Sequence, residues 1–358
     1  MSRRSSSYAV SVVLTVITVL SVIVTNVPRS HSLSPSPGNA ALIAATPTQQ
    51  WQDAKLLRNI KAHADAVGAI AISQDGQLLA TGSDDQTIKL WNLNTGQPLR
   101  TFSGHSDQIT ALAISPNAEI LVSGGGIEDG SIKLWNLKTG ELINTFQKKE
   151  GMIPSLAITP DGKTLASSRR GEGLGFVSEI MLWNLETGKQ LLQFDIENLT
   201  LSLAFSPNGE LLASGSEDGT IHLWNWQSGE IRHILQHPQS LRALAFNQDG
   251  QVLVSESFAE TINVWNPQTG ELLSTPVANP KPVFVNALAL HPSGNILASA
   301  LGAYGRLGLW NLQTGELMTT LTGFSGSIFS LGFSGDGQML VSGSNDGAIA
   351  IWGTGNRE

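Results

Sequence analysis

Seven tryptophans recur at nearly constant spacing, and this repeat constrains the fold more than any other feature of the chain. The intervals between them are 44, 48, 41, 41, 45 and 42 residues, and six of the seven are followed by asparagine. A period of about 40–45 residues is typical of propeller blades. The repeat therefore predicts an all-β propeller with seven blades, carrying Trp91, Trp135, Trp183, Trp224, Trp265, Trp310 and Trp352.

Within each repeat, short apolar segments alternate with turn sequences. In the first repeat the segments are residues 70–73 (Ile-Ala-Ile-Ser), 78–83 (Leu-Leu-Ala-Thr-Gly-Ser) and 87–91 (Thr-Ile-Lys-Leu-Trp). The turns carry Asp-Gly or Asn-Gly, which tolerate the positive φ that tight hairpins require. A Thr-Gly turn then leads to a fourth segment, such as residues 141–146 in the second repeat. Each repeat is thus expected to form one four-stranded antiparallel blade.

The frame around the tryptophans resembles the WD-repeat (WD40) family over roughly residues 55–353. It reads Trp-Asn-Leu-Lys-Thr-Gly-Glu-Leu from Trp135 and Trp-Asn-Leu-Gln-Thr-Gly-Glu-Leu from Trp310. Most repeats carry Trp-Asn where the family usually has Trp-Asp, and asparagine serves the same turn. The frame resembles that of bacterial members of the family.

The resemblance implies a hydrogen-bonded tetrad of His, Ser or Thr, Asp and Trp in each complete blade. Two repeats carry all four members: His63, Thr81, Asp85 and Trp91 in the first, and His105, Ser123, Asp129 and Trp135 in the second. Other repeats keep only part of the tetrad: Asp218 with Trp224 and Asp346 with Trp352 without the histidine, and His237 without the aspartate.

The two ends of the repeat region are expected to close the ring. Few residues follow Trp352, so the seventh repeat lacks a fourth strand, whereas residues 56–63 match residues 98–105 position for position. The segment before the first repeat therefore supplies the outer strand of the last blade. Pairing it removes an open sheet edge.

The N-terminal segment predicts export or membrane anchoring. Residues 1–27 hold two arginines followed by the uncharged run Ala9–Val27, which is near the length needed to cross a bilayer. An uncleaved signal anchor and a cleaved signal peptide, cut near Ser30–Ser32 or Ile43–Ala45, both fit this pattern; a start codon assigned too early is a third alternative. Residues 28–50 are rich in Pro and Ser, as in a linker, and residues 51–358 form the propeller domain.

Charge and composition limit the function classes. The net charge from residue 51 onward is −11, because 18 Lys and Arg face 29 Asp and Glu, and such a field repels nucleic acid. The chain has no cysteine, and its seven histidines form no metal-ligand pattern. The glycine-rich residues 171–175 open no helix, so a phosphate loop is not indicated. We expect no metal, no cofactor and no catalytic residue.

A partner-binding face is expected where the first strand of each blade begins. WD-repeat proteins commonly bind partners there, and apolar side chains at solvent-facing positions suggest a binding patch. Local burial by loops is the alternative reading. The residues at these positions that we predict to bind a partner are Met152, Pro154, Leu199, Leu201, Arg242, Phe284 and Phe329.

These features together predict a non-catalytic scaffold that binds one or more proteins outside the cytoplasm, on the periplasmic or lumenal side. If residues 9–27 are not removed, the membrane is a further partner. A propeller enzyme or small-ligand sensor that uses the central channel is the alternative. A structural part of an envelope complex is a third reading, which the sequence does not separate from the first.

Overall fold

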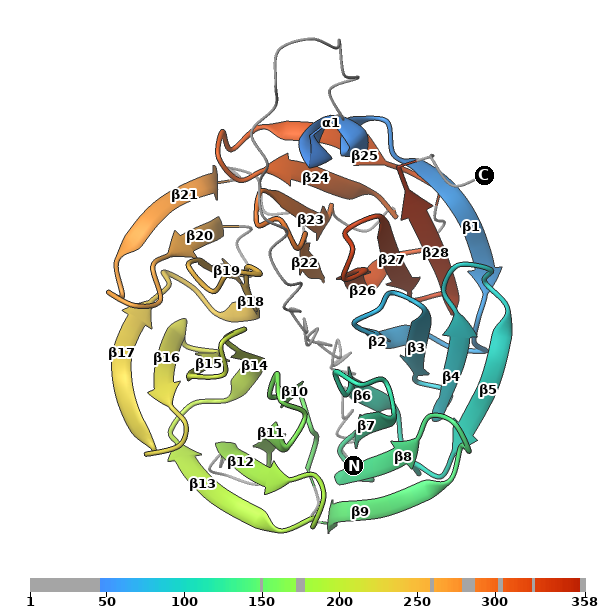
Figure 1. Cartoon of the computed structure of the whole chain (residues 1–358), viewed down its shortest axis with the longest axis vertical. Helices are drawn as coiled ribbons and strands as arrows, with labels where there is room; N and C mark the ends of the chain where they lie inside the picture. The colour runs from blue at the N-terminus through green and yellow to red at the C-terminus, as the bar shows by residue number, and fades with distance from the viewer. Residues whose placement is uncertain are drawn as a thin grey trace, which may run out of the picture.

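The computed structural model describes residues 46–148, 151–171, 178–257, 261–278, 287–301, 305–323 and 326–354. Seven four-stranded sheets are arranged in a ring, as Figure 1 shows. All neighbouring strands within a sheet are antiparallel, and in six sheets they follow one another in chain order. The predicted seven-bladed propeller is confirmed.

The strands of the first four blades have these bounds. The first blade contains β2 (Val67–Ile72), β3 (Leu78–Ser83), β4 (Thr87–Asn92) and β5 (Pro98–Ser103), and the second β6 (Ile109–Ile114), β7 (Ile120–Gly125), β8 (Ser131–Asn136) and β9 (Leu142–Lys148). The third contains β10 (Leu156–Ile158), β11 (Thr164–Arg170), β12 (Ser178–Asn184) and β13 (Gln190–Ile196), and the fourth β14 (Thr200–Phe205), β15 (Leu211–Ser216), β16 (Thr220–Asn225) and β17 (Glu230–Gln236).

The remaining three blades follow the same plan, except that the seventh takes its outer strand from the N-terminal side. The fifth contains β18 (Leu241–Phe246), β19 (Leu253–Ser257), β20 (Thr261–Trp265) and β21 (Leu272–Ala278), and the sixth β22 (Leu288–Leu290), β23 (Ile296–Ala300), β24 (Leu307–Asn311) and β25 (Leu317–Leu321). The seventh contains β26 (Ile328–Phe333), β27 (Met339–Ser344), β28 (Ala348–Gly353) and β1 (Lys55–Lys61).

The hydrophobic core lies between neighbouring blades. One cluster joins Ala69 and Ala80 of the first blade to Leu112 and Leu121 of the second. At the outer edge, an aromatic residue on the fourth strand of one blade packs against the tryptophan of the next: Phe102 on Trp135 (5.6 Å between ring centroids), Phe146 on Trp183 (5.6 Å) and Phe194 on Trp224 (4.9 Å). No blade buries both of its faces without its neighbours.

Strand β1 closes the ring as the outer strand of the seventh blade (Figure 1). It pairs with β28 in antiparallel register, with Asn59 opposite Ala350 and Ile60 opposite Ile349. The expected closure is confirmed.

A short helix that the sequence pattern did not indicate reinforces this closure. Helix α1 (Pro47–Gln52) has Thr46 as its N-cap and carries Trp51. The Trp51 side chain is fully buried, donates its indole N–H to the Gly337 carbonyl (3.0 Å) and packs edge-on against Phe333. The helix is therefore joined to the seventh blade.

The prediction for residues 1–27 lies outside the described residues, as does the predicted linker 28–50 up to residue 45. The end of that predicted linker is described, and its residues 47–50 belong to α1. Among the residues that the structure does describe, no helix is both long enough and apolar enough to cross a bilayer.

Candidate binding surface

A tryptophan–hydroxyl hydrogen bond recurs in all seven blades. Each indole N–H donates to a Ser or Thr hydroxyl on the second strand of its own blade, over 2.8–3.2 Å. The third and sixth blades, in which the sequence shows neither the tetrad histidine nor its aspartate, keep this bond between Trp183 and Ser167 and between Trp310 and Ser299.

In the first blade the four tetrad residues form one continuous chain. His63 Nδ1 lies 3.0 Å from Asp85 Oδ2, and His63 Nε2 lies 2.8 Å from the Thr81 hydroxyl, which also accepts the Trp91 indole N–H at 2.9 Å. Burial acts to raise the pKa of Asp85, but hydrogen bonds from Thr87 and other donors outweigh it and lower that pKa to about 2. The carboxylate is thus held ionised within the blade.

The second blade repeats this arrangement. His105 Nδ1 contacts Asp129, His105 Nε2 lies 2.6 Å from the Ser123 hydroxyl, and Trp135 donates to the same hydroxyl at 2.8 Å. Both histidines are buried. Such satisfied buried networks make a fold rigid.

The predicted partner-binding residues do not form an exposed patch. Leu199, Leu201 and Met152 are 4–6% exposed and Arg242 is 5% exposed. Pro154 is also buried, Phe329 is half-buried, and Phe284 lies outside the described residues. The expectation that Met152, Pro154, Leu199, Leu201 and Arg242 face solvent is therefore wrong.

The reason for this burial is the close approach of neighbouring blades where the first strands begin. The Thr110 hydroxyl of the second blade donates to the Ile153 carbonyl at 2.7 Å, across the boundary with the third. Leu199 and Leu201 pack as a small cluster of their own. Burial also lowers the pKa of Arg242 to about 10, although the nearby Glu256 charge acts in the opposite direction.

Large apolar side chains are instead exposed on the fourth strands. These strands form the perimeter of the ring (Figure 1), and all seven expose at least one large hydrophobic residue. Sequence reasoning overlooked this surface, although an apolar pair such as Leu142-Ile143 or Leu272-Leu273 follows several Thr-Gly-Glu turns. We call the following set the perimeter residues: Leu56, Leu57, Leu99, Leu142, Ile143, Leu191, Leu192, Ile231, Ile234, Leu272, Leu273 and Leu317.

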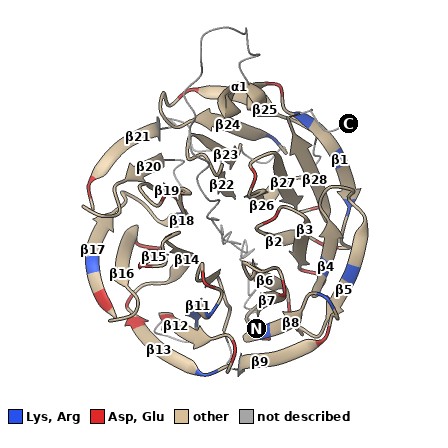
Figure 2. Ribbon diagram, viewed as in Figure 1, with Lys and Arg blue, Asp and Glu red and all other residues tan. Residues whose placement is uncertain are grey.

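The described basic residues do not gather on one blade (Figure 2), whereas several aspartates cluster at one junction between blades. In Figure 2 the Lys and Arg residues of the described part are scattered around the ring rather than gathered on one blade. Three aspartates surround Asp84 at the junction of the first and second blades: Asp65, Asp85 and Asp107. Burial and repulsion by these carboxylates raise the pKa of Asp84 to about 6.

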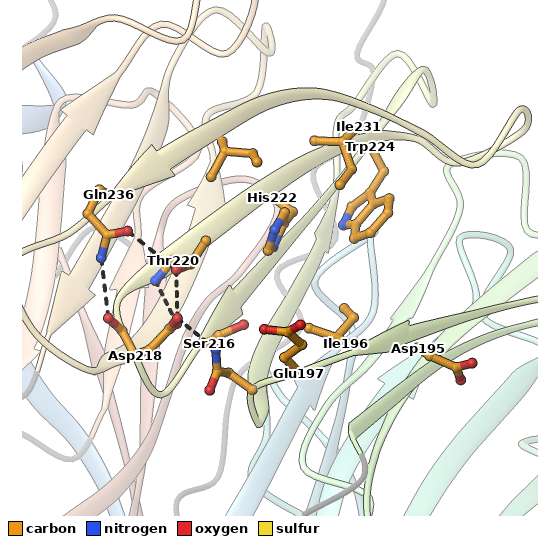
Figure 3. Close-up of a pocket in the computed structure, with 12 residues that line it drawn as sticks. Asp195, Ile196, Glu197, Ser216, Asp218, Thr220, His222, Trp224, Ile231 and Gln236 are labelled. Carbon is orange, nitrogen blue, oxygen red and sulfur yellow. Dashed lines mark hydrogen bonds between the residues drawn. The ribbon is translucent and has the colours of Figure 1, made fainter.

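A cavity of about 340 Å³ lies beside the outer half of the fourth blade, where β13 of the third blade ends. Its wall on the fourth blade comes from three cross-strand pairs of β16 and β17: Thr220 with Gln236, His222 with Ile234, and Trp224 with Ile231. In Figure 3 the Thr220, His222, Trp224, Ile231 and Gln236 side chains lie above Ile196 and Glu197. Asp218 and Ser216 lie at the lower left of the view, and Asp195 lies at the right. We call this cavity the blade-4 pocket.

Two buried polar atoms in the blade-4 pocket make no hydrogen bond. They are the Ser216 hydroxyl and Nδ1 of His222. Burial lowers the pKa of His222, against the opposing effect of the Asp218 charge. Its imidazole is therefore neutral at neutral pH. Because buried polar atoms are normally paired, these two mark a place where a ligand would find hydrogen-bond partners.

Within the described ranges, no group of three or more His, Asp and Glu side chains has the geometry to hold a metal ion. His233 contacts the Gln268 carbonyl at 2.9 Å, whereas His237 is fully buried, so the two do not form a pair.

Comparison with known families assigns the repeats. The pattern described as "WD domain, G-beta repeat" matches residues 54–92, 96–136, 197–225, 229–266 and 315–353, which together make up more than half of the chain. The chain belongs to the WD40 family. The five matched segments include both blades with a complete tetrad and the segment that closes the ring, so this WD40 propeller keeps the characteristic polar network in its regular blades. The resemblance inferred from the tryptophan frame is confirmed.

One curated protein is similar over part of this WD40 chain. The Ribosome biogenesis protein BOP1 homolog of Aedes aegypti is 34% identical over 76 residues. The aligned stretch is 20% of this chain and 9% of the mosquito protein, so the chain matches less than a tenth of that relative's length. The similarity is limited to a stretch about as long as two propeller blades.

Proposed function

We propose that this WD40 propeller is a protein-interaction scaffold that binds its partner through the perimeter residues. The exposure of large hydrophobic side chains on every outer strand carries the proposal: Leu99 is 50% exposed, Ile143 51% and Ile234 62%. Exposed apolar surface is costly in water and marks interaction sites when it is contiguous. The closed ring holds these side chains on rigid sheets, which lowers the entropic cost of binding.

A non-catalytic role is part of the proposal. Four hydrogen-bonded titratable residues, His63, Asp85, His105 and Asp129, are committed to the tetrads. An enzyme or sensor that uses the central channel is the alternative, and it needs polar groups that converge on the axis.

The proposed location is outside the cytoplasm, on the periplasmic or lumenal side. The support is in the sequence: Arg3 and Arg4 precede the uncharged run Ala9–Val27, and Lys and Arg flanking a span are retained in the cytoplasm. Protease treatment of intact and lysed cells tests this location. The protease must be shown to reach the compartment outside the cytoplasmic membrane. If it does, a propeller that resists digestion in intact cells would contradict the proposed location.

We do not extend the role named for the mosquito relative to this chain, because the alignment covers so little of that protein. The net charge of −11 from residue 51 onward also opposes binding to RNA. The proposed partner is therefore a protein, and no nucleic acid is proposed.

Site-specific photocrosslinking in cells tests the scaffold role. A photoreactive amino acid is placed at Ile143 or Ile234 on the perimeter, and at Gln227 in an exposed turn as a matched control. The proposal predicts a discrete protein adduct from the perimeter positions and none from Gln227. Equal labelling at all three positions, or no adduct at any, would reject it.

A further inference from the structure

The blade-4 pocket and the side chain of Lys89 occupy corresponding places in the fourth and first blades. Lys89 of β4 is opposite Thr81 in the first blade, and His222 of β16 is opposite Ser214 in the fourth. In the first blade the Lys89 ammonium reaches across to the strand end of the neighbouring blade and donates to the Ala62 carbonyl at 2.6 Å. Histidine is shorter than lysine, and His222 leaves this space open.

A second replacement lies at the wall of the same space. Ile196, at the end of β13, precedes the fourth blade as His63 precedes the first. Each lies at the same distance in sequence before the hydroxyl that accepts the tryptophan N–H. His63 bonds both Thr81 and Asp85, whereas Ile196 can bond neither Ser214 nor Asp218. The Asp218 carboxylate, which has no histidine partner, instead accepts hydrogen bonds from the Asn198 amide (2.8 Å) and the Thr220 hydroxyl (2.8 Å) at the pocket edge.

The pocket has a strongly acidic lining. Asp195, Glu197 and Asp218 are all exposed at its edge, and no Lys or Arg is among the residues that line it. The other side is apolar and is formed by Ile196, Trp224 and Ile234. An acidic edge beside an apolar wall suits a cation on an alkyl chain.

The unpaired Ser216 hydroxyl and His222 Nδ1 give the pocket two groups that can accept hydrogen bonds from a ligand. Ser216 is fully buried, and its hydroxyl has no partner; in the first blade the equivalent Ser83 donates to the Asp65 carbonyl at 3.1 Å. Nδ1 of His222 is likewise buried and unpaired. A lysine ammonium has three N–H donors and no acceptor, so it can satisfy a hydroxyl, an imidazole nitrogen and a carboxylate together.

We propose that the blade-4 pocket binds a lysine side chain of the partner protein, which takes the place of the internal lysine seen in the first blade. The alkyl stem packs on Ile196, Trp224 and Ile234, and the ammonium lies among Ser216, His222 and the acidic residues. Ile234 belongs both to this pocket and to the perimeter residues. The inference therefore rests on the proposed function and names the side chain that the scaffold recognises.

Titration of the full-length protein with short capped peptides tests the inference. The probes are acetyl-Gly-Lys-Gly-amide, its norleucine analogue, which lacks only the ammonium, its arginine analogue, and butylamine as a free amine. Isoleucine methyl NMR reports binding at Ile196, Ile231 and Ile234. We expect the lysine peptide to shift these methyl signals and to bind at least about tenfold more tightly than norleucine, as a charge-assisted hydrogen bond would give.

Variants locate the binding. His222→Lys supplies an internal ammonium, as in the first blade, and should abolish lysine binding while the fold is kept. Asp218→Asn should weaken binding at least about fivefold, because one charge at the edge is lost. Glu186→Gln, which removes an exposed charge outside the pocket, should have no effect.

Several outcomes would overturn the inference. Equal binding of lysine and norleucine would show an apolar site only, and tighter binding of arginine would reject lysine as the ligand. Butylamine that binds as tightly as the peptide would point to a free amine instead of a protein. If His222→Lys leaves photocrosslinking to the partner unchanged, the pocket assignment fails while the scaffold role stands. If the lysine peptide binds but no perimeter position gives an adduct, the scaffold role fails instead.

Discussion

Ile196, the last residue of β13, lies beside the fourth blade at the position that His63 holds beside the first. The rest of the polar network survives there: Trp224 donates to Ser214 at 2.8 Å, and Asp218 accepts hydrogen bonds from the amide (3.0 Å) and hydroxyl (2.8 Å) of Thr220. Asp85 and Thr87 make the same two contacts in the first blade, at 3.0 and 2.6 Å. A single substitution thus separates the fourth blade from a complete tetrad.

The substitution Ile196→His is expected to complete this tetrad. The new imidazole would bridge Ser214 and Asp218, and a hydrogen bond to a carboxylate at this partly exposed site contributes about 1–2 kcal/mol. A double-mutant cycle with Asp218→Ala, followed by thermal denaturation, measures this coupling. Ile196→Gln is the control for loss of the apolar side chain. A coupling free energy near zero would show that the fourth blade does not present the tetrad geometry.

The substitution Asp84→Asn is expected to stabilise the protein in a pH-dependent way. The folded-state pKa of Asp84 is raised to about 6 by burial and by Asp65, Asp107 and Asp85, so ionisation disfavours the folded state. Its destabilising effect is absent at low pH and grows as pH rises from about 4 to above 6. The variant should therefore melt at a higher temperature than the wild type at pH 8, and at about the same temperature at pH 4. Glu186→Gln, at an exposed position, serves as the control. An increase in melting temperature that does not depend on pH would contradict the raised pKa of Asp84.

Two apolar-to-charged substitutions distinguish the buried inner residues from the perimeter. Leu201 is 4% exposed, so Leu201→Asp buries an unpaired charge and should cost more than about 2 kcal/mol of stability. Ile234 is 62% exposed, and Ile234→Asp should leave the melting temperature nearly unchanged while it weakens partner crosslinking. Denaturation and crosslinking must be measured on the same variants. A stable Leu201→Asp protein would restore the inner face as a candidate surface.

Removal of the closing strand is expected to be far more damaging than removal of the preceding segment. A chain that begins at residue 46 keeps α1 and β1, and we expect it to fold cooperatively. A chain that begins at residue 64 lacks β1, which leaves β28 as an open edge. Circular dichroism melts of the two truncated chains, with light scattering to detect association, make the comparison. Identical melting behaviour would contradict the role of β1.

Trp51 should contribute as strongly as a core residue, although it precedes the repeats. Its side chain is fully buried against Phe333 and His291 and is hydrogen-bonded to Gly337. Trp51→Ala is expected to destabilise the protein by about 3–5 kcal/mol. Trp51→Phe keeps most of the packing and should recover much of this loss in thermal denaturation. An alanine variant as stable as the wild type would mean that the helix is only loosely attached.

The fold could be predicted because its determinants are periodic. The tryptophan spacing, the Asp-Gly turns and the match between residues 56–63 and 98–105 are local patterns, and the structure confirms both the blade number and the closure. Gly76 and Gly209, for example, take φ of 67° and 72° in these turns. Helix α1 was missed because a single short helix has no period to detect.

The candidate surface could not be predicted in the same way. The burial of Leu201 and Arg242 depends on how closely neighbouring blades approach, and no single repeat encodes that distance. The blade-4 pocket depends on Ile196 at the end of β13 in the third blade and on Ser216 and His222 in the fourth, so its two sides meet only when the two blades pack. The replacements at Ile196 and His222 carry no pattern of their own in the sequence, and their effect is visible only in the packed ring.

The pairing of β1 with β28 also sets an order of events during synthesis. Residues 55–61 are made almost 300 residues before residues 348–353, with which they pair among the described strands. The six intermediate blades can form first and bring these two segments close, which reduces the entropy lost when the ring closes. Until that moment, β1 is an unpaired β-segment that carries Leu56 and Leu57. A nascent or stalled chain of this protein would accordingly expose a strand suited to pairing with the wrong edge, which is the substrate that folding chaperones act upon.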